Sequence, residues 1–278
     1  MGSEWLYAKI YWGLHFADPL LKEIFPLIIT TIHQQKAKKK WFFIRYNDPV
    51  PHIRFRVELS DPSHCSFVVS TINHLLEQFV QEGLISSISF DTYKREIERY
   101  TPLCIELSEE LFFRQSEIIL MTIQQSSSIN DRWLLAFQHM ESLFEAAKFT
   151  MIEKKDFCIR MNTLYQQEFD NNKNLWVHLN NKFKDRKNWF AKPLDKLGET
   201  NERLSAVQYS IFSTLRKHTD QEEFRSTRAS LLSSYIHMFI NRLFVSDQRL
   251  HELAVYHFMV CYYKMQIGKQ KEFMNPIN

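Results

Sequence analysis

The chain has 278 residues, of which 45% are apolar and 24% charged, and its formal net charge is only +3. These values are typical of one large or two small folded domains, and so small a charge is too slight to indicate nucleic-acid binding. The five glycines form no phosphate-binding loop, and the four cysteines show neither metal-ligand nor disulfide-framework spacing. No apolar run approaches the ~18 residues of a membrane span. We therefore expect a cytoplasmic protein without a zinc site or a nucleotide-binding fingerprint.

The first hundred residues predict strands and helices in the order β-α-β-β-α-β. This is the ferredoxin-like order, in which both helices cover one face of the sheet and leave the other to a partner or a second domain. Pro26, in the middle of the first predicted helix, is expected to kink it. The predicted elements are a strand at 5–13, a helix capped at Asp18-Pro19 and running to about Gln34, two strands flanking the turn Asp48-Pro49-Val50-Pro51, a helix at 66–81 and a strand at 84–93.

Charged side chains occupy the strand after the turn, where a strand needs none. Because side chains alternate, His52, Arg54 and Arg56 share one face, while Ile53 and Phe55 lie on the other, which we expect to be core. Two arginines at i and i+2 stand about 7 Å apart, which suits the two carboxylates of a glutamate or an acidic peptide. The alternative is a solvated face whose arginines cover apolar neighbours. We expect the charged face to be open.

From about residue 108 onward, apolar residues recur at helical spacing with almost no glycine or proline. This pattern predicts an α+β protein, in which a ferredoxin-like region at 1–104 packs against a helical region at 105–278 to form one compact unit with a cleft between them. The segment between Asn171 and Thr200 is the least regular and is expected to be a loop or a cap. The predicted helices cover 108–125, 131–148, 156–168, 202–218, 226–245 and 248–266.

Two further polar clusters could reach that cleft. Glu96 and Arg99 would share a face of a helical turn just after the last predicted strand, although exposed structural ion pairs show the same spacing. His237 and Asn241 lie beside the apolar stripe of a strongly apolar helix, at a boundary position that often faces a cleft. A hydrogen-bonded core histidine would give the same pattern. The residues alone leave both interpretations open.

Three separated motifs, however, resemble a known family in their order and spacing. The chain is similar to the thiopeptide-type bacteriocin biosynthesis domain, which is also the C-terminal glutamate-elimination domain of LanB-type lanthipeptide dehydratases. The resemblance runs from Trp5 to about Tyr263 and looks like the free-standing, or split, form. The chain departs from the family at Thr101-Pro102 and at Val245, where glycines are common, and this bears on loop shape and peptide fit. The motifs are Trp41-Phe-Phe-Ile-Arg-Tyr through His52-Ile-Arg-Phe-Arg56, Tyr93-Lys-Arg-Glu-Ile-Glu-Arg-Tyr100 and His237-Met-Phe-Ile-Asn-Arg242.

The resemblance implies a carbon-oxygen lyase that needs neither a metal nor an organic cofactor. In this family a serine or threonine of a precursor peptide arrives esterified by glutamate. The domain removes the Cα proton and expels glutamate, which leaves dehydroalanine or dehydrobutyrine. The resemblance implies catalytic roles for His237, Arg56, Arg99 and Glu96, and substrate binding by Arg54, His52, Arg45 and Asn241.

The implied partners are the precursor peptide, with its leader and core, and a separate LanB-like protein that uses glutamyl-tRNA. Direct nucleic-acid binding is not expected, and a homodimer stays open. The same fold hosts pyridine synthases, which join two dehydroalanines in a formal [4+2] cycloaddition and need no glutamate site. The retained arginine, glutamate and histidine set therefore favours elimination. A third alternative is a non-catalytic protein that binds the leader peptide along its sheet.

Overall fold

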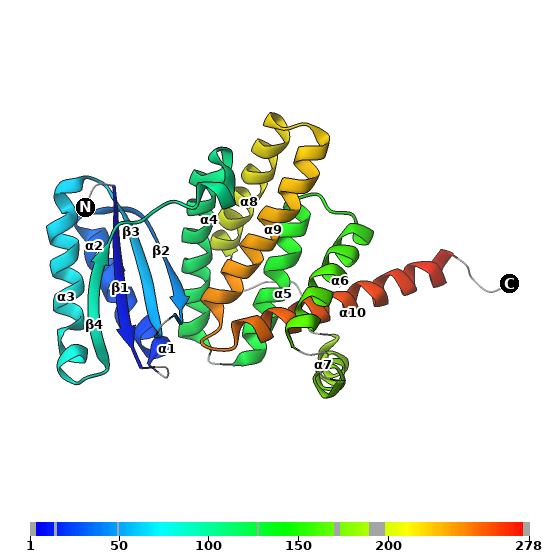
Figure 1. The fold of residues 1–278 in the computed structure, drawn as a ribbon, viewed down its shortest axis with the longest axis horizontal. Coiled ribbons are helices and arrows are strands. Elements are labelled where there is room, and N and C mark those ends of the chain that lie inside the picture. The colour runs from blue at the N-terminus through cyan, green and yellow to red at the C-terminus, as the bar shows by residue number, and fades with distance from the viewer. Residues whose placement is uncertain are drawn as a thin grey trace.

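The computed structural model describes residues 4–13, 16–48, 50–126, 128–169, 173–188 and 198–274, with the backbone alone for 198, 199 and 270–274. Over these ranges the chain is a mostly helical α+β protein with a small antiparallel sheet near its N-terminus (Figure 1). The sheet order is β2-β3-β1-β4, and each neighbouring pair is antiparallel. The strands are β1 (Trp5–Trp12), β2 (Lys38–Tyr46), β3 (His52–Leu59) and β4 (Ile85–Asp91).

Helices α2 (Phe25–Gln34) and α3 (Cys65–Gln81) lie on the side of the sheet away from the bundle (Figure 1). The short helix α1 (Ala17–Pro19) instead reaches the bundle, because its Asp18 pairs with Arg132. Phe25 packs edge-on against Phe43 and Phe55, and Ile53, Phe55 and Val57 are fully buried. The predicted core face of β3 is therefore confirmed. So is the hairpin between β2 and β3, although Pro49 of its turn lies outside the described residues.

The first helical stretch differs from the prediction in its details. It begins at Ala17, and Asp18 makes no capping hydrogen bond, because its carboxylate pairs with two arginines instead. The predicted N-cap at Asp18 is therefore wrong. A π-helical turn, Leu20–Ile24, joins α1 to α2, so the helix is distorted in the turn just before Pro26.

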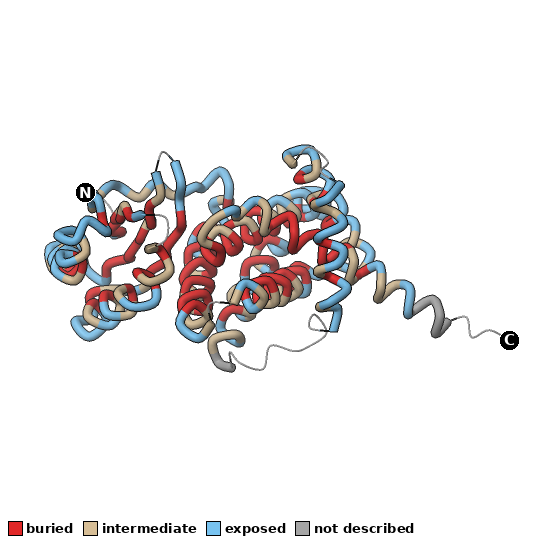
Figure 2. The backbone as a smooth tube through the Cα atoms, turned by 90° about the horizontal axis from the view of Figure 1, so that it is seen from below, coloured by how far each residue is buried: buried red, intermediate tan, exposed pale blue. Residues whose placement is uncertain are grey.

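In the part of the chain that the structure describes, seven helices follow the sheet and form the bundle. Buried backbone runs through the centre of both the sheet layer and the bundle (Figure 2). The helices are α4 (Ile97–Gln125), α5 (Ile129–Ala146), α6 (Met151–Glu168), α7 (Lys173–Arg186), α8 (Gly198–His218), α9 (Gln221–Leu243) and α10 (Gln248–Met274).

Two helices correct the expected boundaries. Helix α4 begins at Ile97 rather than near 108, because it continues across a kink at Thr101, whose backbone is non-helical (φ 60°, ψ 152°). Helix α7 occupies part of the segment expected to be irregular, and it buries Leu179 and Phe183, which lie one turn apart. Residues 189–197 of that segment lie outside the described residues.

The edge strand β2 joins the sheet to the bundle. The backbone N–H of Phe43 donates to the Ser116 hydroxyl of α4 (3.4 Å), and its carbonyl accepts from Arg242 Nε of α9 (2.6 Å). The ring of Phe42 packs against Phe112 of α4. Helices thereby cover an edge whose unpaired backbone groups would otherwise need other partners.

Candidate active site

His237 lies on α9 with one ring nitrogen fixed by a buried carboxylate. Its Nδ1 is 2.9 Å from Oε2 of Glu252, on the neighbouring helix α10, and Glu252 is 1% exposed. The histidine side chain itself is 31% exposed. Since a carboxylate only accepts hydrogen bonds, Nδ1 carries the proton and Nε2 is left for a substrate. A histidine oriented in this way is suited to general acid–base catalysis.

A second polar layer lies behind Glu252. Burial and the neighbouring Glu252 raise the pKa of the Tyr165 phenol. Arg249 donates to the Tyr165 hydroxyl (2.9 Å) and pairs with Glu168 at the surface. Glu252 was not among the residues predicted from the sequence, where it shows only as one acidic residue within an apolar helical run.

The Glu96–Arg99 cluster lies against α9, the helix that carries His237. Arg99 Nε donates to the hydroxyl of Ser234 (3.2 Å), which precedes His237 by three residues on α9. Arg99 Nη1 lies 3.4 Å from Glu96, whose side chain is half exposed. Two of the three clusters singled out in the sequence are therefore neighbours across the α4–α9 contact.

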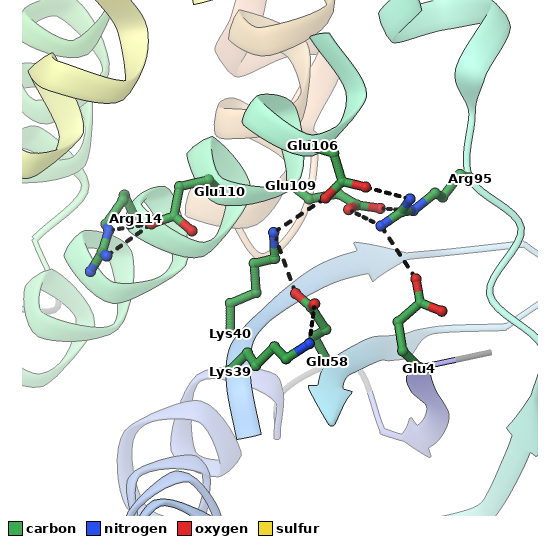
Figure 3. A network of polar contacts seen from close by, with 9 residues as sticks. All are labelled: Glu4, Lys39, Lys40, Glu58, Arg95, Glu106, Glu109, Glu110 and Arg114. Atoms are coloured by element: carbon green, nitrogen blue, oxygen red, sulfur yellow. Dashed lines mark hydrogen bonds and ion pairs between the residues drawn. The ribbon is translucent and has the colours of Figure 1, made fainter. Parts of the chain in front are cut away.

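The segment that carries Glu96 is anchored by its neighbour Arg95 (Figure 3). Arg95 donates through Nε and Nη2 to the two oxygens of Glu109 (2.9 Å each), a fully buried residue of α4. It also pairs with Glu106 and Glu4. These contacts hold the connection between β4 and α4 against the helix.

Arg56 is buried on the charged face of the sheet, with 6% exposure. Its guanidinium lies over the rings of Tyr7 (4.9 Å), Phe42 (5.2 Å) and Tyr93 (4.6 Å). Burial lowers the pKa of Arg56, and within the part of the chain that the structure describes it forms no ion pair. A buried cation of this kind favours the approach of an anion.

Arg54 and His52 form a linked pair beside Arg56. Arg54 lies 3.4 Å over the Tyr46 ring and donates from Nε to Nε2 of His52 (3.2 Å), while His52 Nδ1 donates to the carbonyl of Val50 (2.9 Å). Burial lowers the pKa of His52, which agrees with a neutral ring that accepts from Arg54. His52 is only 2% exposed, so the expectation of an open charged face is wrong, because aromatic rings cover it.

Arg45 closes the end of α9. Its Nε donates to the carbonyl of Arg242 (2.8 Å) and its Nη2 to Asp18 (2.6 Å), and Arg132 likewise joins the Leu243 carbonyl to Asp18. Burial opposes ionisation of Asp18, but the two guanidiniums lower its pKa overall. These contacts satisfy terminal carbonyls that a helix leaves unpaired. Arg45 and Asn241 both line a cavity of about 250 Å³ at this end of α9.

Arg242 is a buried residue to which the sequence assigned no role. It is fully buried and donates to Phe43 O, Gln115 Oε1 (3.0 Å) and Met238 O (2.9 Å), so it ties β2, α4 and α9 together. Burial lowers the pKa of Arg242 to about 9, which leaves it charged at neutral pH. Its place directly after Asn241 in the third motif was the one signal available.

The described ranges contain neither a metal-ligand cluster nor a membrane-spanning helix. Among those residues, no group of three or more histidine, cysteine, aspartate and glutamate side chains is placed to hold a metal ion. No helix within them combines the length and apolar character needed to cross a bilayer.

The family described as "Lantibiotic biosynthesis dehydratase C-term" matches residues 5–263 of this chain. The chain therefore belongs to this family of C-terminal dehydratase domains. The matched residues run from the first strand of the N-terminal sheet into the last helix of the bundle.

Two curated relatives come from lantibiotic biosynthesis. Subtilin biosynthesis protein SpaB of Bacillus subtilis is 26% identical over 261 residues, which cover 89% of this chain and 24% of SpaB. Nisin biosynthesis protein NisB of Lactococcus lactis subsp. lactis is 26% identical over 271 residues, which cover 92% of this chain and 25% of NisB. The chain thus spans about a quarter of the length of these relatives.

Two solved structures share the fold. The tRNA-dependent lantibiotic dehydratase MibB of Microbispora sp. 107891 superposes with a TM-score of 0.70 at 18% identity, over 97% of this chain and 29% of MibB. The pyridine synthase TbtD from thiomuracin biosynthesis gives 0.66 at 10% identity, over 95% of this chain and the whole of TbtD. At such identities the similarity shows the fold alone.

Proposed function

We propose that this chain eliminates glutamate from glutamylated serine or threonine of a ribosomally made precursor peptide. A base takes the Cα proton, the electrons of that C–H bond form the Cα=Cβ double bond, and the Cβ–O bond breaks to release glutamate as a carboxylate. Dehydroalanine or dehydrobutyrine remains. The reaction needs a positioned proton-transfer group and cations for the developing anions. The observation that carries the proposal is His237, oriented by buried Glu252 and adjacent through Ser234 to Arg99.

His237 would move the proton through Nε2, the nitrogen not engaged by Glu252. A well-placed acid–base group contributes roughly 10²- to 10⁴-fold in rate. The carboxylate of Glu252 would hold the ring in one tautomer and stabilise the imidazolium formed when His237 accepts a proton.

Arg54, Arg56 and Arg99 would bind the negative charge of the reaction. Deprotonation at Cα spreads charge onto the peptide carbonyl as an enolate, and the departing glutamate is anionic. One well-aimed donor is worth roughly 10²- to 10³-fold. Arg56 forms no ion pair in the described chain, so a substrate anion would supply its missing counter-charge.

Glu96 would bind the ammonium group of the glutamyl ester or orient Arg99. A glutamyl ester carries an ammonium as well as a free carboxylate, and the half-exposed Glu96 is the carboxylate beside Arg99. The contacts of His52, Arg45 and Asn241 support roles in substrate binding. For His52 and Arg45 the role would be indirect, through a neighbouring residue or the shape of a cavity. His52 orients Arg54, and Arg45 shapes the cavity that Asn241 lines.

The whole chain would act as one catalytic unit. Helix α4 spans the expected boundary between residues 1–104 and 105–278, and the sheet order with two helices on one face supports a ferredoxin-like layout. The proposed partners are the precursor peptide, with leader and core, and a separate glutamylating LanB-like protein. We propose no direct nucleic-acid contact, a cytoplasmic setting and, as an open option, a homodimer.

The similarity in fold to TbtD favours one other activity, a [4+2] cycloaddition of two dehydroalanines. That reaction forms no glutamate leaving group, so it gives no reason to keep Arg54, Arg56, Glu96 and Arg99 together. The presence of this set supports elimination. A leader-binding protein without catalysis would not need the His237–Glu252 pair.

The test is to incubate the purified chain with a glutamylated serine peptide and to follow peptide mass and free glutamate together. Elimination predicts a dehydroalanine peptide with the wild-type chain and retained ester with His237→Ala. A retained ester with both proteins, from a peptide that carries its leader, would refute the proposal. Turnover of a peptide with two dehydroalanines would then indicate the cycloaddition.

A further inference from the structure

A basic cavity lies at the end of the bundle where α8 turns into α9 and α5 turns into α6. It has a volume of about 380 Å³ and is about 18 Å along α9 from His237, since Arg225 precedes His237 by twelve residues and a helix rises 1.5 Å per residue. Its charged lining residues are Lys148, Arg216, Arg225, Arg228, Glu153 and Asp220.

Both carboxylates of this cavity are already engaged. Glu153 accepts from Arg228 Nη2 (2.9 Å) and from the backbone N–H of Thr150 (2.7 Å), and these contacts lower its pKa. Asp220 caps α9 by accepting from two backbone N–H groups. Lys148, Arg216 and Arg225 form no ion pair with any residue that the structure describes. The cavity therefore presents surplus positive charge.

The floor of the cavity is built from a buried arginine and two aromatic rings. Arg228 is 8% exposed, donates to the carbonyl of Ala147 (3.1 Å) and lies 4.1 Å over the ring of Phe149. Two guanidiniums lie near the ring of Phe224, that of Arg228 at 5.4 Å and that of Arg216 at 4.9 Å. The guanidiniums of such a site can pair with a carboxylate, and the aromatic rings can pack against the methylene groups of the same acidic side chain.

We propose that this cavity binds acidic side chains of an extended peptide. A long polyanion such as RNA fits less well, because Glu222 and Glu223 lie exposed on the first turn of α9 and the net charge of the chain is only +3. Resting on the proposed function, the peptide would be the precursor itself. An extended chain advances about 3.3 Å per residue, so its acidic segment would lie at least about six residues from the residue being modified.

The test uses a labelled ten-residue peptide with two aspartates, its asparagine counterpart, and fluorescence anisotropy at low salt. The double variant Arg216→Glu/Arg225→Glu should weaken binding of the aspartate peptide by roughly tenfold or more, because two attractive charges become repulsive. Arg160→Glu, a single charge reversal at an exposed position on α6, is the control outside the cavity and should change binding less than about twofold.

Equal binding of the aspartate and asparagine peptides, or no loss in the double variant, would overturn the proposal. So would displacement of the peptide from this site by tRNA at much lower concentration. Elimination from a short glutamylated peptide without acidic residues should be unaffected by the double variant. Failure of that reaction in the wild-type chain would count against the proposed function, whereas the binding result stands separately.

Discussion

At the scale of single residues, the account depends on the contact between His237 and Glu252. Glu252→Gln keeps an acceptor for Nδ1–H but removes the charge that would stabilise an imidazolium. We expect kcat to fall about 10- to 100-fold with little change in KM, the usual range for a residue that orients a catalytic ligand or base. Steady-state kinetics on a glutamylated peptide, with initial rates taken over a range of peptide concentrations, measures both constants. Glu168→Gln, which removes a surface partner of Arg249, is the control; an equal loss there would point to damage of the α6–α10 contact instead.

The sequence identified His237 and Arg99 as candidates, but it did not identify what holds them. Ser234 becomes the partner of Arg99 only when α9 packs against α4. Glu252 becomes the partner of His237 only when α9 packs against α10. No spacing along the chain predicts either contact. The buried state of His52 could not be predicted either. Strand alternation puts it on the charged face, and only the tertiary structure shows the rings that cover this face.

At the scale of elements, the kink of α4 is a strained position. Thr101 has φ 60° and ψ 152°, a conformation that glycine adopts freely and a β-branched residue does not. Strain of this kind costs about 1–3 kcal/mol.

Thr101→Gly should therefore stabilise the protein by about 1 kcal/mol, since the relief of strain exceeds the ~0.5–1 kcal/mol entropic cost of glycine. We expect Tm to rise by about 2 °C in calorimetry. Thr163→Gly, in the regular helix α6, should instead destabilise the protein by a few tenths of a kcal/mol or more. A lower Tm for Thr101→Gly would show that the kink is not strained.

Elements with a clear period were predictable, and those that depend on tertiary contacts were not. The strands and most bundle helices follow from alternation and helical spacing, as observed. The start of α4 was placed too late because the prediction followed the apolar period from about residue 108, whereas the helix extends back to Ile97 through the kink at Thr101. Helix α7 has few apolar residues, so Leu179 and Phe183 gave a weak signal.

At the scale of the whole molecule, three histidines make stability depend on pH. Burial lowers the pKa of His139 to about 3 and those of His251 and His257 to about 4. The unfolded chain titrates near 6.5, so below that pH it binds protons that the folded chain excludes. Each contribution is fully present above pH ~6.5 and is lost as the pH falls toward 4.

We expect the free energy of unfolding to decrease steadily from pH 7 to pH 5 in urea titrations. His139→Gln can keep a hydrogen bond to Gln115 and should flatten this decrease, because one neutral buried imidazole is gone. Stability that does not change over this range, in the wild-type chain, would show that these histidines are not held neutral.

The central claim is that this molecule breaks a Cβ–O bond by removing the Cα proton. The most direct measurement is a single-turnover reaction with a glutamylated serine peptide deuterated at Cα, with product mass and free glutamate followed in time. The account predicts equal amounts of glutamate and dehydroalanine peptide and loss of the deuterium. It also predicts a slower rate than with the same peptide carrying ordinary hydrogen at Cα. Release of glutamate with return of the serine peptide would show ester hydrolysis and contradict the account.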